Sequence, residues 1–233
     1  MRFALPPLNA GLMIVTCLTL GDHPTVNADE PPKPPLAVTS LFDGRTLDGW
    51  KPIPGSKVGT VSVEADSIAL SVGSPMTGVT STRADLPTLD YALSFEAKRT
   101  SGNDFFAAAT FPVGPSFVTL VNGGWGGSVT GLSLVNGASA SENETNHFVK
   151  YQDNVWYAFE IQVTARVIRC LVDGAEVFAF DHEGAQLKTR LETRANEPLG
   201  FATYRSSSLI RKVQCRPMTP PQVAEANARI KRD

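Results

Sequence analysis

The chain lacks an excess of charge of either sign and lacks the common cofactor motifs. Its 233 residues hold 21 Lys and Arg against 23 Asp and Glu, a net charge of −2. No block of like charges forms a basic stripe, so nucleic acid is not an expected partner. There is no Gly-rich phosphate loop, no H-E-x-x-H, no G-x-S-x-G and no Cys-x-x-Cys, which sets aside the common cofactor enzymes.

No hydrophobic run is long enough for a permanent membrane span. Residues 11–20 (GLMIVTCLTL) follow Arg2 and precede the small-residue site Val26-Asn27-Ala28, the pattern of a signal peptide. A bilayer core of about 30 Å needs roughly 20 apolar residues, so this run predicts a leader over residues 1–28 that is removed. We therefore expect a secreted or periplasmic protein, cleaved after Ala28.

A lipoprotein signal ending at Cys17 is the alternative. It is disfavoured because Thr16 occupies the place where Gly, Ala or Ser is usual.

Cysteine and histidine are scarce after the leader. His147 and His182 are too few for a multi-histidine zinc site, although oxygen ligands could still hold calcium. Cys170 and Cys215 lie in strand-like runs and lack the accompanying His and Asn residues that would indicate a nucleophilic cysteine. Two interpretations stay open for them: a disulfide, which needs Cα atoms about 5.5 Å apart on neighbouring strands, or two buried free thiols.

Strand patterns dominate the rest of the chain. Nineteen glycines and 17 prolines against 19% charged residues favour short strands and turns. Apolar residues alternate with other residues over 91–98 and 157–164, and more briefly at Ile68, Leu70 and Val72. Such alternation predicts strands with one buried face.

Turn chemistry agrees with these strands. Asp173-Gly174 between VIRCLV and AEVFAF predicts a tight hairpin. Further strand pairs are expected at 105–111 with 117–121 and at 199–204 with 209–215. With no fixed repeat and no βα alternation, we predict an all-β, two-sheet antiparallel β-sandwich.

Four segments follow from these patterns. Residues 1–28 are the signal peptide, and residues 29–39, which include PPKPP, are an extended Pro-rich linker. Residues 40–217 form the sandwich. Residues 218–233 form a short helical tail, expected to fray because its apolar positions are too few to bury a face.

The domain carries a family resemblance. Residues 40–51 (SLFDGRTLDGWK) resemble the opening signature of the 3-keto-disaccharide hydrolase domain family, and YALSFEAK, NDFF, the strands around 154–172 and GFATYR…IRKV follow in order. Together these segments cover most of residues 40–216. The resemblance implies a concanavalin A-like jelly roll and the cleavage of 3-keto-glycosides or 3-keto-disaccharides by lyase or hydrolase chemistry.

Two family features are missing. The segment N-S-G-I/V-x-F-R, which presents an Arg on an inner strand, is replaced by residues 102–108 (GNDFFAA), and Tyr204-Arg205 stands where a His is familiar near the last strands. The segments GGWGG and ASENET mark a distinct branch. Site residues are therefore assigned from this chain itself.

The segment 122–127 (NGGWGG) is the first candidate site. Its glycines let the backbone approach a ligand, and Trp125 can offer its indole face to a sugar ring. The alternative is that Trp125 folds back as a plug over the sandwich edge.

The segment 140–147 (ASENETNH) is the second candidate. Glu142 and Glu144 are candidate acid/base groups or calcium ligands, with Asn143 and His147 as substrate-binding residues. If the segment is extended, both carboxylates lie on one side. The alternative is a solvated loop, and Asn143 also heads a glycosylation sequon.

Asp104 and Arg205 complete the catalytic candidates. A carboxylate can remove the proton beside a 3-keto group, and an Arg can stabilise the resulting enolate oxygen. The alternatives are a turn cap for Asp104 and a surface ion pair for Arg205. Asn103 is a further substrate-binding candidate, and the remaining charged residues considered are Arg190, Glu192 and Arg194. Asp43 and Trp50 are expected to be structural.

Three classes of function stay open: an exported enzyme acting on 3-keto-sugars, a non-catalytic carbohydrate-binding module and a structural envelope protein. The enzyme requires Glu142 or Glu144, Asp104 and Arg205 to meet at one point on the sheet. The expected partner is a carbohydrate. No cofactor is certain, although a divalent cation such as calcium fits the oxygen ligands, and the sequence does not set the oligomeric state.

Overall fold

The computed structural model describes Met1 and residues 37–55 and 58–230. The expected signal peptide and most of the expected linker lie outside these residues. No helix of the described part is long and apolar enough to span a membrane.

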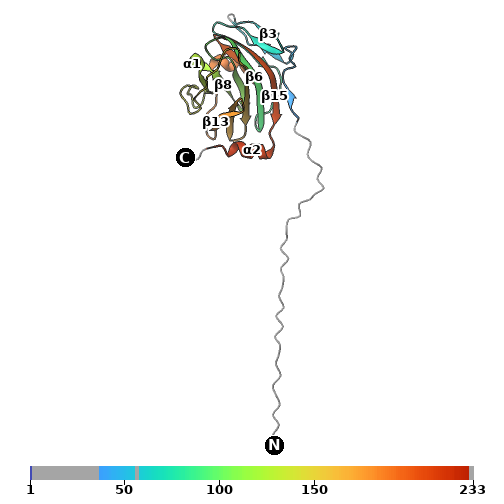
Figure 1. Cartoon of the computed structure of the whole chain (residues 1–233), viewed down its shortest axis with the longest axis vertical. Coiled ribbons are helices and arrows are strands. Elements are labelled where there is room, and N and C mark those ends of the chain that lie inside the picture. The colour runs from blue at the N-terminus through green and yellow to red at the C-terminus, as the bar shows by residue number, and fades with distance from the viewer. Residues whose placement is uncertain (2–36, 56–57, 231–233) are drawn as a thin grey trace. The chain divides into compact units, whose positions relative to one another are not determined.

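The described domain is built from two antiparallel sheets, seen in Figure 1. The eight-stranded sheet runs in the order β13 (Ala175–Asp181), β12 (Val167–Val172), β11 (Tyr157–Val163), β6 (Tyr91–Gly102), β15 (Ser206–Pro217), β4 (Ser67–Leu70) and β3 (Val61–Glu64), with β1 (Thr39–Ser40) also paired to β15. The seven-stranded sheet runs in the order β10 (His147–Phe148), β9 (Val129–Ser133), β8 (Ser116–Gly123), β7 (Ala108–Val113), β14 (Gly200–Tyr204), β5 (Met76–Ser81) and β2 (Trp50–Pro52). The predicted two-sheet β-sandwich is confirmed.

Three short helical elements accompany the sheets. The single turn α1 (Gly124–Gly127) follows β8, the 3-10 helix η1 (Leu191–Asn196) precedes β14, and α2 (Pro220–Asn227) follows β15. In Figure 1, α2 lies beside the end of the long strands β6 and β15.

The core lies between the sheets and is rich in aromatic rings. Phe95 of β6 stacks on Phe159 with ring centroids 4.9 Å apart and meets Phe201 of the other sheet edge-on at 4.8 Å. Trp50 packs on Phe201 and donates its indole N–H to Leu41 O at 2.7 Å, which confirms its structural role. Burial of each such ring stabilises the fold by roughly 1.5–3 kcal/mol.

The strongest periodic patterns predicted the buried faces correctly. In β6, Tyr91, Leu93, Phe95 and Ala97 are all buried. In the hairpin between β12 and β13, Asp173 and Gly174 have φ of 50° and 77°, the left-handed backbone that a two-residue turn requires. Asp43 caps the turn at Gly44 by accepting from the N–H groups of Thr46 and Arg45, and these bonds lower the pKa of Asp43.

Two strand boundaries differ from the prediction. Val72 lies beyond β4 and is exposed, because β3 pairs with β4 only as far as Leu70. The strand expected from residue 105 begins at Ala108. Of the residues just before it, Asp104 and Phe105 line the candidate site described below, whereas Phe106 and Ala107 are buried in the core.

The tail is a docked helix, so the expected fraying is wrong. Thr219 and Gln222 form a reciprocal capping box at the start of α2. Ala226 is fully buried and packs on Ala92 and Met218. The prediction failed because it required a broad apolar face, whereas one alanine fits against the small side chain of Ala92 on the outer face of β6.

The two cysteines are free and buried, so the disulfide interpretation is wrong. Strands β11 and β6 lie between β12, which carries Cys170, and β15, which carries Cys215. Three inter-strand steps separate the cysteines by roughly 14 Å, far beyond disulfide reach.

Candidate functional site

The outer face of the seven-stranded sheet forms the floor of a cavity of about 410 Å³. Its sheet residues come from β5, β8, β9 and β14. Its walls come from four connecting segments: residues 104–105 before β7, the α1 turn, the loop around 139–142 and the segment 190–193 in and before η1. We call this space the outer cavity.

One end of the floor is a row of hydroxyl groups. The pairing register places Ser133 opposite Thr119 and Thr119 opposite Thr110. Thr110 and Thr119 share a hydrogen bond of 2.9 Å, and Thr119 donates to Thr193 of η1 at 3.1 Å. This chain of threonines holds η1 over the sheet.

Ser133 differs from the other members of this row. Its side chain is fully buried at the cavity floor, yet Oγ has no hydrogen-bond partner among the described residues. A buried hydroxyl without a partner loses about 1–3 kcal/mol relative to a paired one. A ligand atom in the cavity can remove that loss.

The same end carries the cation of the site. Arg190 donates from Nη1 to Ser139 Oγ at 2.9 Å, and its Nε lies 3.5 Å from Glu192 Oε2. About 40% of the Arg190 side chain is exposed. Arg190 is therefore oriented by two wall residues and can still reach a ligand.

Asp104 and Trp125 stand at the other end of the cavity. Asp104 accepts the N–H of Phe105 at Oδ1, 2.8 Å away, and its own N–H is donated to Ser206 Oγ. Trp125 has φ 50° and ψ 52° and is 45% exposed. The structure thus places Trp125 on the cavity wall as an accessible ring and not as a plug over the sandwich edge.

Glu142 projects from the third wall. Its Oε2 accepts the N–H of Ser139 at 3.3 Å, and the residue is otherwise exposed. Three of the predicted site residues, Asp104, Trp125 and Glu142, therefore line one cavity although 38 residues separate the first from the last.

The other predicted residues do not line the cavity. Glu144 and Asn103 are exposed outside it. Arg205 is also exposed, with φ 46°, and its guanidinium covers the Tyr204 ring at 5.4 Å. The expected meeting of a glutamate, Asp104 and Arg205 at one point is therefore wrong for Arg205, which does not line the cavity that holds Asp104 and Glu142. His147 of β10 stacks on Phe178 of β13, with ring centroids 5.8 Å apart.

Asn143 explains why Glu142 and Glu144 separate. Its Nδ2 donates to the carbonyls of Leu132, Ala138 and Ser139, and its Oδ1 accepts from Thr145. These bonds fold the segment into turns, whereas the shared carboxylate face required an extended chain. The side-chain amide of Asn143 therefore serves to hold the loop in this conformation.

Sequence reasoning gave least weight to the residues that complete the cavity. Arg190 and Glu192 are predicted only as members of a group of charged residues, Tyr204 only as the neighbour of Arg205 at the place of the family His, and Ser133 and Thr119 not at all. Hydroxyl residues at alternate positions of apolar strands are a usable signal. Which of them face each other depends on strand register, which the sequence pattern does not give.

Calcium has no matching cluster in the described structure. Across residues 37–55 and 58–230, no three His, Cys, Asp or Glu side chains are grouped to share a metal ion.

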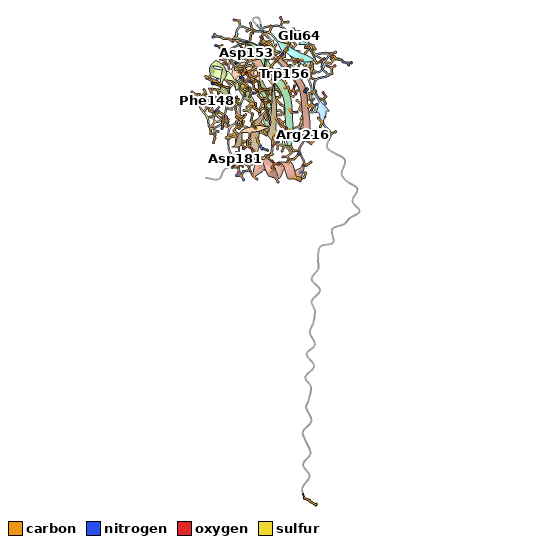
Figure 2. All side chains as sticks on the ribbon, in the orientation of Figure 1. Glu64, Phe148, Asp153, Trp156, Asp181 and Arg216 are labelled. Carbon is orange, nitrogen blue, oxygen red and sulfur yellow. The ribbon has the colours of Figure 1, made fainter. Side chains whose placement is uncertain are left out.

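The outer face of the other sheet presents a contrast. A depression of about 290 Å³ lies there, but its charges neutralise one another: Glu96 accepts from Arg211 and Lys212, and Glu160 accepts from Arg216. Trp156, labelled in Figure 2, is covered by Arg211, whose guanidinium carbon lies 3.9 Å from the ring centroid. Both carboxylates that line this depression, Glu96 and Glu160, are therefore held in salt bridges with basic side chains of β15.

Comparison with known proteins supports the fold. A search of curated protein sequences finds no match. Among solved structures, the chain is similar to Crh5 transglycosylase in complex with NAG (12% identity, 79% of this chain and 85% of that chain, TM-score 0.53). It is also similar to a protein from work on endo-acting O-glycanases that prominent members of the human gut microbiota express to initiate mucin breakdown (12% identity, 79% and 99%, TM-score 0.52). At such identities the likeness shows a common sandwich fold.

A family model identifies the chain more closely. The model of the 3-keto-alpha-glucoside-1,2-lyase-like domain matches residues 37–216, which is most of the chain and nearly all of the described sandwich. The chain is therefore a member of the 3-keto-alpha-glucoside-1,2-lyase-like domain family, a family of carbohydrate-active domains.

Proposed function

We propose that this chain is an exported enzyme that cleaves 3-keto-glucosides by elimination across C1 and C2 of the sugar. The observation that supports it is the convergence of carboxylates, one guanidinium and an accessible indole on the outer cavity from four separate segments. Family membership supports the same reaction class. The leader-like residues 1–28 support export.

The chemistry needs two proton transfers and one stabilised oxyanion. A carboxylate base removes the proton on C2, which the adjacent ketone acidifies, and the negative charge develops on the C3 oxygen. The electron pair then forms the C1–C2 double bond, the C1–O bond breaks, and the leaving oxygen takes up a proton. Addition of water to the resulting enone gives the free 3-keto-sugar, so that the net reaction is hydrolysis.

The cavity residues can be assigned to these roles. We assign Glu142 as the base, because it lines the cavity and its carboxylate accepts a backbone N–H, with no salt bridge to it among the described residues. Arg190 stabilises the enolate oxygen, with Glu192 and Ser139 fixing its direction. Asp104, on the opposite wall, returns a proton to the leaving oxygen. A positioned acid or base contributes on the order of 10²–10⁴-fold to such a step.

A non-catalytic carbohydrate-binding module is the second candidate. The accessible Trp125 favours it, because a sugar ring can stack on an exposed indole without any chemistry. Both an enzyme and a binding module would bind the sugar, but only the enzyme would turn it over.

Proton exchange gives the most direct test. The purified protein is incubated with a 3-keto-disaccharide in D₂O, with and without chelator. Release of the second sugar is followed together with deuterium incorporation at C2 of recovered substrate. The enzyme predicts both signals, whereas a binding module predicts saturable binding with neither. Binding without exchange or cleavage would overturn the proposed function.

A further inference from the structure

The floor of the outer cavity changes its chemistry along the strands. Starting from the hydroxyl row, two residues further along each strand the facing side chains are small and aliphatic, with Val121 opposite Gly131 and Ala108 opposite Ala202. Two residues beyond that, Tyr204 faces Met76. Phe105 lies against Tyr204 with ring centroids 5.5 Å apart.

These rows set the dimensions of the floor. Neighbouring rows on one face are separated by two residues, about 7 Å, so the aromatic row lies roughly 13 Å from the hydroxyl row. That length accommodates two ring-sized groups. The cavity therefore has a polar half over the hydroxyl row and an apolar half over Val121, Phe105, Tyr204 and Met76.

The wall residues divide in the same way. Thr193 is bonded to Thr119, which places η1 and the nearby Arg190 on the polar half. Asp104 directly precedes Phe105 and so stands at the apolar half. Arg190, which stabilises the enolate, and Asp104, which protonates the leaving group, thus lie at opposite ends of the cavity. An elimination whose leaving group lies in the apolar half requires this arrangement.

The apolar half is poorly suited to a second sugar. Its accessible surface is formed by the partly exposed rings of Phe105 and Tyr204, together with Met76 and Val121. Beneath these rings lie two buried apolar clusters, which contain Met76, Ala108 and Ala202 in one and Val121, Val129 and Ala140 in the other. The hydroxyl groups of a sugar pressed on this floor lose water and find few partners, which is costly. A planar apolar group meets no such penalty and gains from the aromatic pair.

Resting on the proposed function, we propose that the preferred substrates are 3-keto-glucosides of apolar, ring-bearing alcohols or phenols and not 3-keto-disaccharides. The keto-sugar occupies the polar half, where the buried and unpartnered Ser133 Oγ hydrogen-bonds a sugar hydroxyl. The aglycone occupies the apolar half, and its oxygen faces Asp104.

The test compares benzyl 3-keto-α-glucoside with 3-keto-maltose. Both have an unactivated alcohol as leaving group, so their leaving-group acidities are similar. We expect kcat/KM to favour the benzyl substrate by about tenfold or more. Tyr204→Leu should reduce that preference several-fold, whereas Tyr204→Phe should keep it. Ser133→Ala should lower kcat/KM for both substrates and leave their ratio unchanged.

Binding of the unoxidised glycosides separates this inference from the proposed function. Benzyl α-glucoside and maltose are titrated against the wild type and Tyr204→Leu, with Trp125 fluorescence or calorimetry as the readout. If neither keto-substrate is turned over, but benzyl α-glucoside still binds more tightly than maltose and Tyr204→Leu removes that difference, only the proposed function is contradicted. The assignment of the apolar half is overturned if kcat/KM for 3-keto-maltose equals or exceeds that for the benzyl substrate. It is also overturned if maltose binds as tightly as benzyl α-glucoside or more tightly.

Discussion

Trp125 owes its exposure to the residues before it. Gly123 has φ 74°, and a Cβ on Gly124 would lie only 2.7 Å from Val121 Cγ1, so neither position tolerates a side chain without strain or clash. The chain therefore turns sharply out of β8, and the indole is carried to the wall of the outer cavity. In this loop, glycine determines the direction of a functional side chain.

Replacing Trp125 with Ala should weaken substrate binding by about 1 to 3 kcal/mol, because the stacking face that it offers to a substrate ring at the Asp104 end of the cavity is lost. The rate of the bound chemical step should change much less, since no proton passes through the indole. Titration and single-turnover kinetics separate the two effects. The exposed Phe148, on the flank of the molecule in Figure 2 and outside the cavity, gives a matched control as Phe148→Ala.

The two glutamates of the polar loop provide a matched pair for the base assignment. Glu142→Gln keeps the shape and the hydrogen bond from Ser139 but removes the proton acceptor, so kcat should fall about a hundredfold or more while binding survives. Glu144→Gln, two residues away but outside the cavity, should keep near wild-type kcat. Equal kcat for both variants would place the base elsewhere.

At the scale of elements, α2 shows how a short helix can be fixed to a sheet. The capping box satisfies its first N–H groups, and Thr164 Oγ1 donates to Asn227 Oδ1 at 2.7 Å near its last turn. Arg169, buried on β12, reaches Glu225 at 3.5 Å. Near the first turn of α2, Arg216 of β15 donates from Nη1 to Gln222 Oε1 at 3.3 Å. Helix and sheet are thus joined at both ends of the helix, so the tail belongs to the sandwich.

Thr219→Ala should lower the free energy of unfolding by about 1 kcal/mol, the usual loss when an N-cap hydroxyl is removed. Urea unfolding followed by tryptophan fluorescence measures this change. Thr82 is exposed and makes no cap, so Thr82→Ala should stay within about 0.5 kcal/mol of the wild type. A neutral Thr219→Ala would mean that packing of Ala226 alone holds the helix.

At the scale of the whole molecule, sheet order decides the chemistry of the cysteines. Burial raises the pKa of the Cys170 thiol well above its usual value and raises the pKa of Cys215 to about 11. The folded state therefore keeps both protons to a higher pH than the unfolded state, whose thiols ionise near about 8.5. Their contribution to stability is present below about pH 8.5 and is lost as the pH rises toward 11.

Both thiols should accordingly resist iodoacetamide at neutral pH and react only when the chain unfolds. Mass spectrometry after labelling with and without urea counts the modified cysteines. A reducing agent should leave the melting temperature unchanged, because no disulfide exists to be broken. Unfolding titrations should show stability declining above about pH 8.5, and a disulfide-linked peptide in the native protein would contradict the sheet order.

The sequence by itself determined the fold class and much of the core. Period-two runs such as Tyr91 to Ala97 dictate which face is buried, and Asp173-Gly174 dictates a turn, because both signals act over a few neighbouring residues. The family resemblance came from equally local segments, including the turn at Asp43 and the buried Trp50.

Only the tertiary structure decided which polar residues form the site. Asp104, Glu142 and Arg190 line one cavity because the segments that carry them all lie over the outer face of the seven-stranded sheet. That arrangement depends on strand order and register over long sequence separations. Glu144 and Arg205 were excluded for the same reason: the Asn143 amide folds one away, and the turn after Tyr204 directs the other outward. Sequence pattern reports the local preference of a side chain, while long-range pairing decides its neighbours.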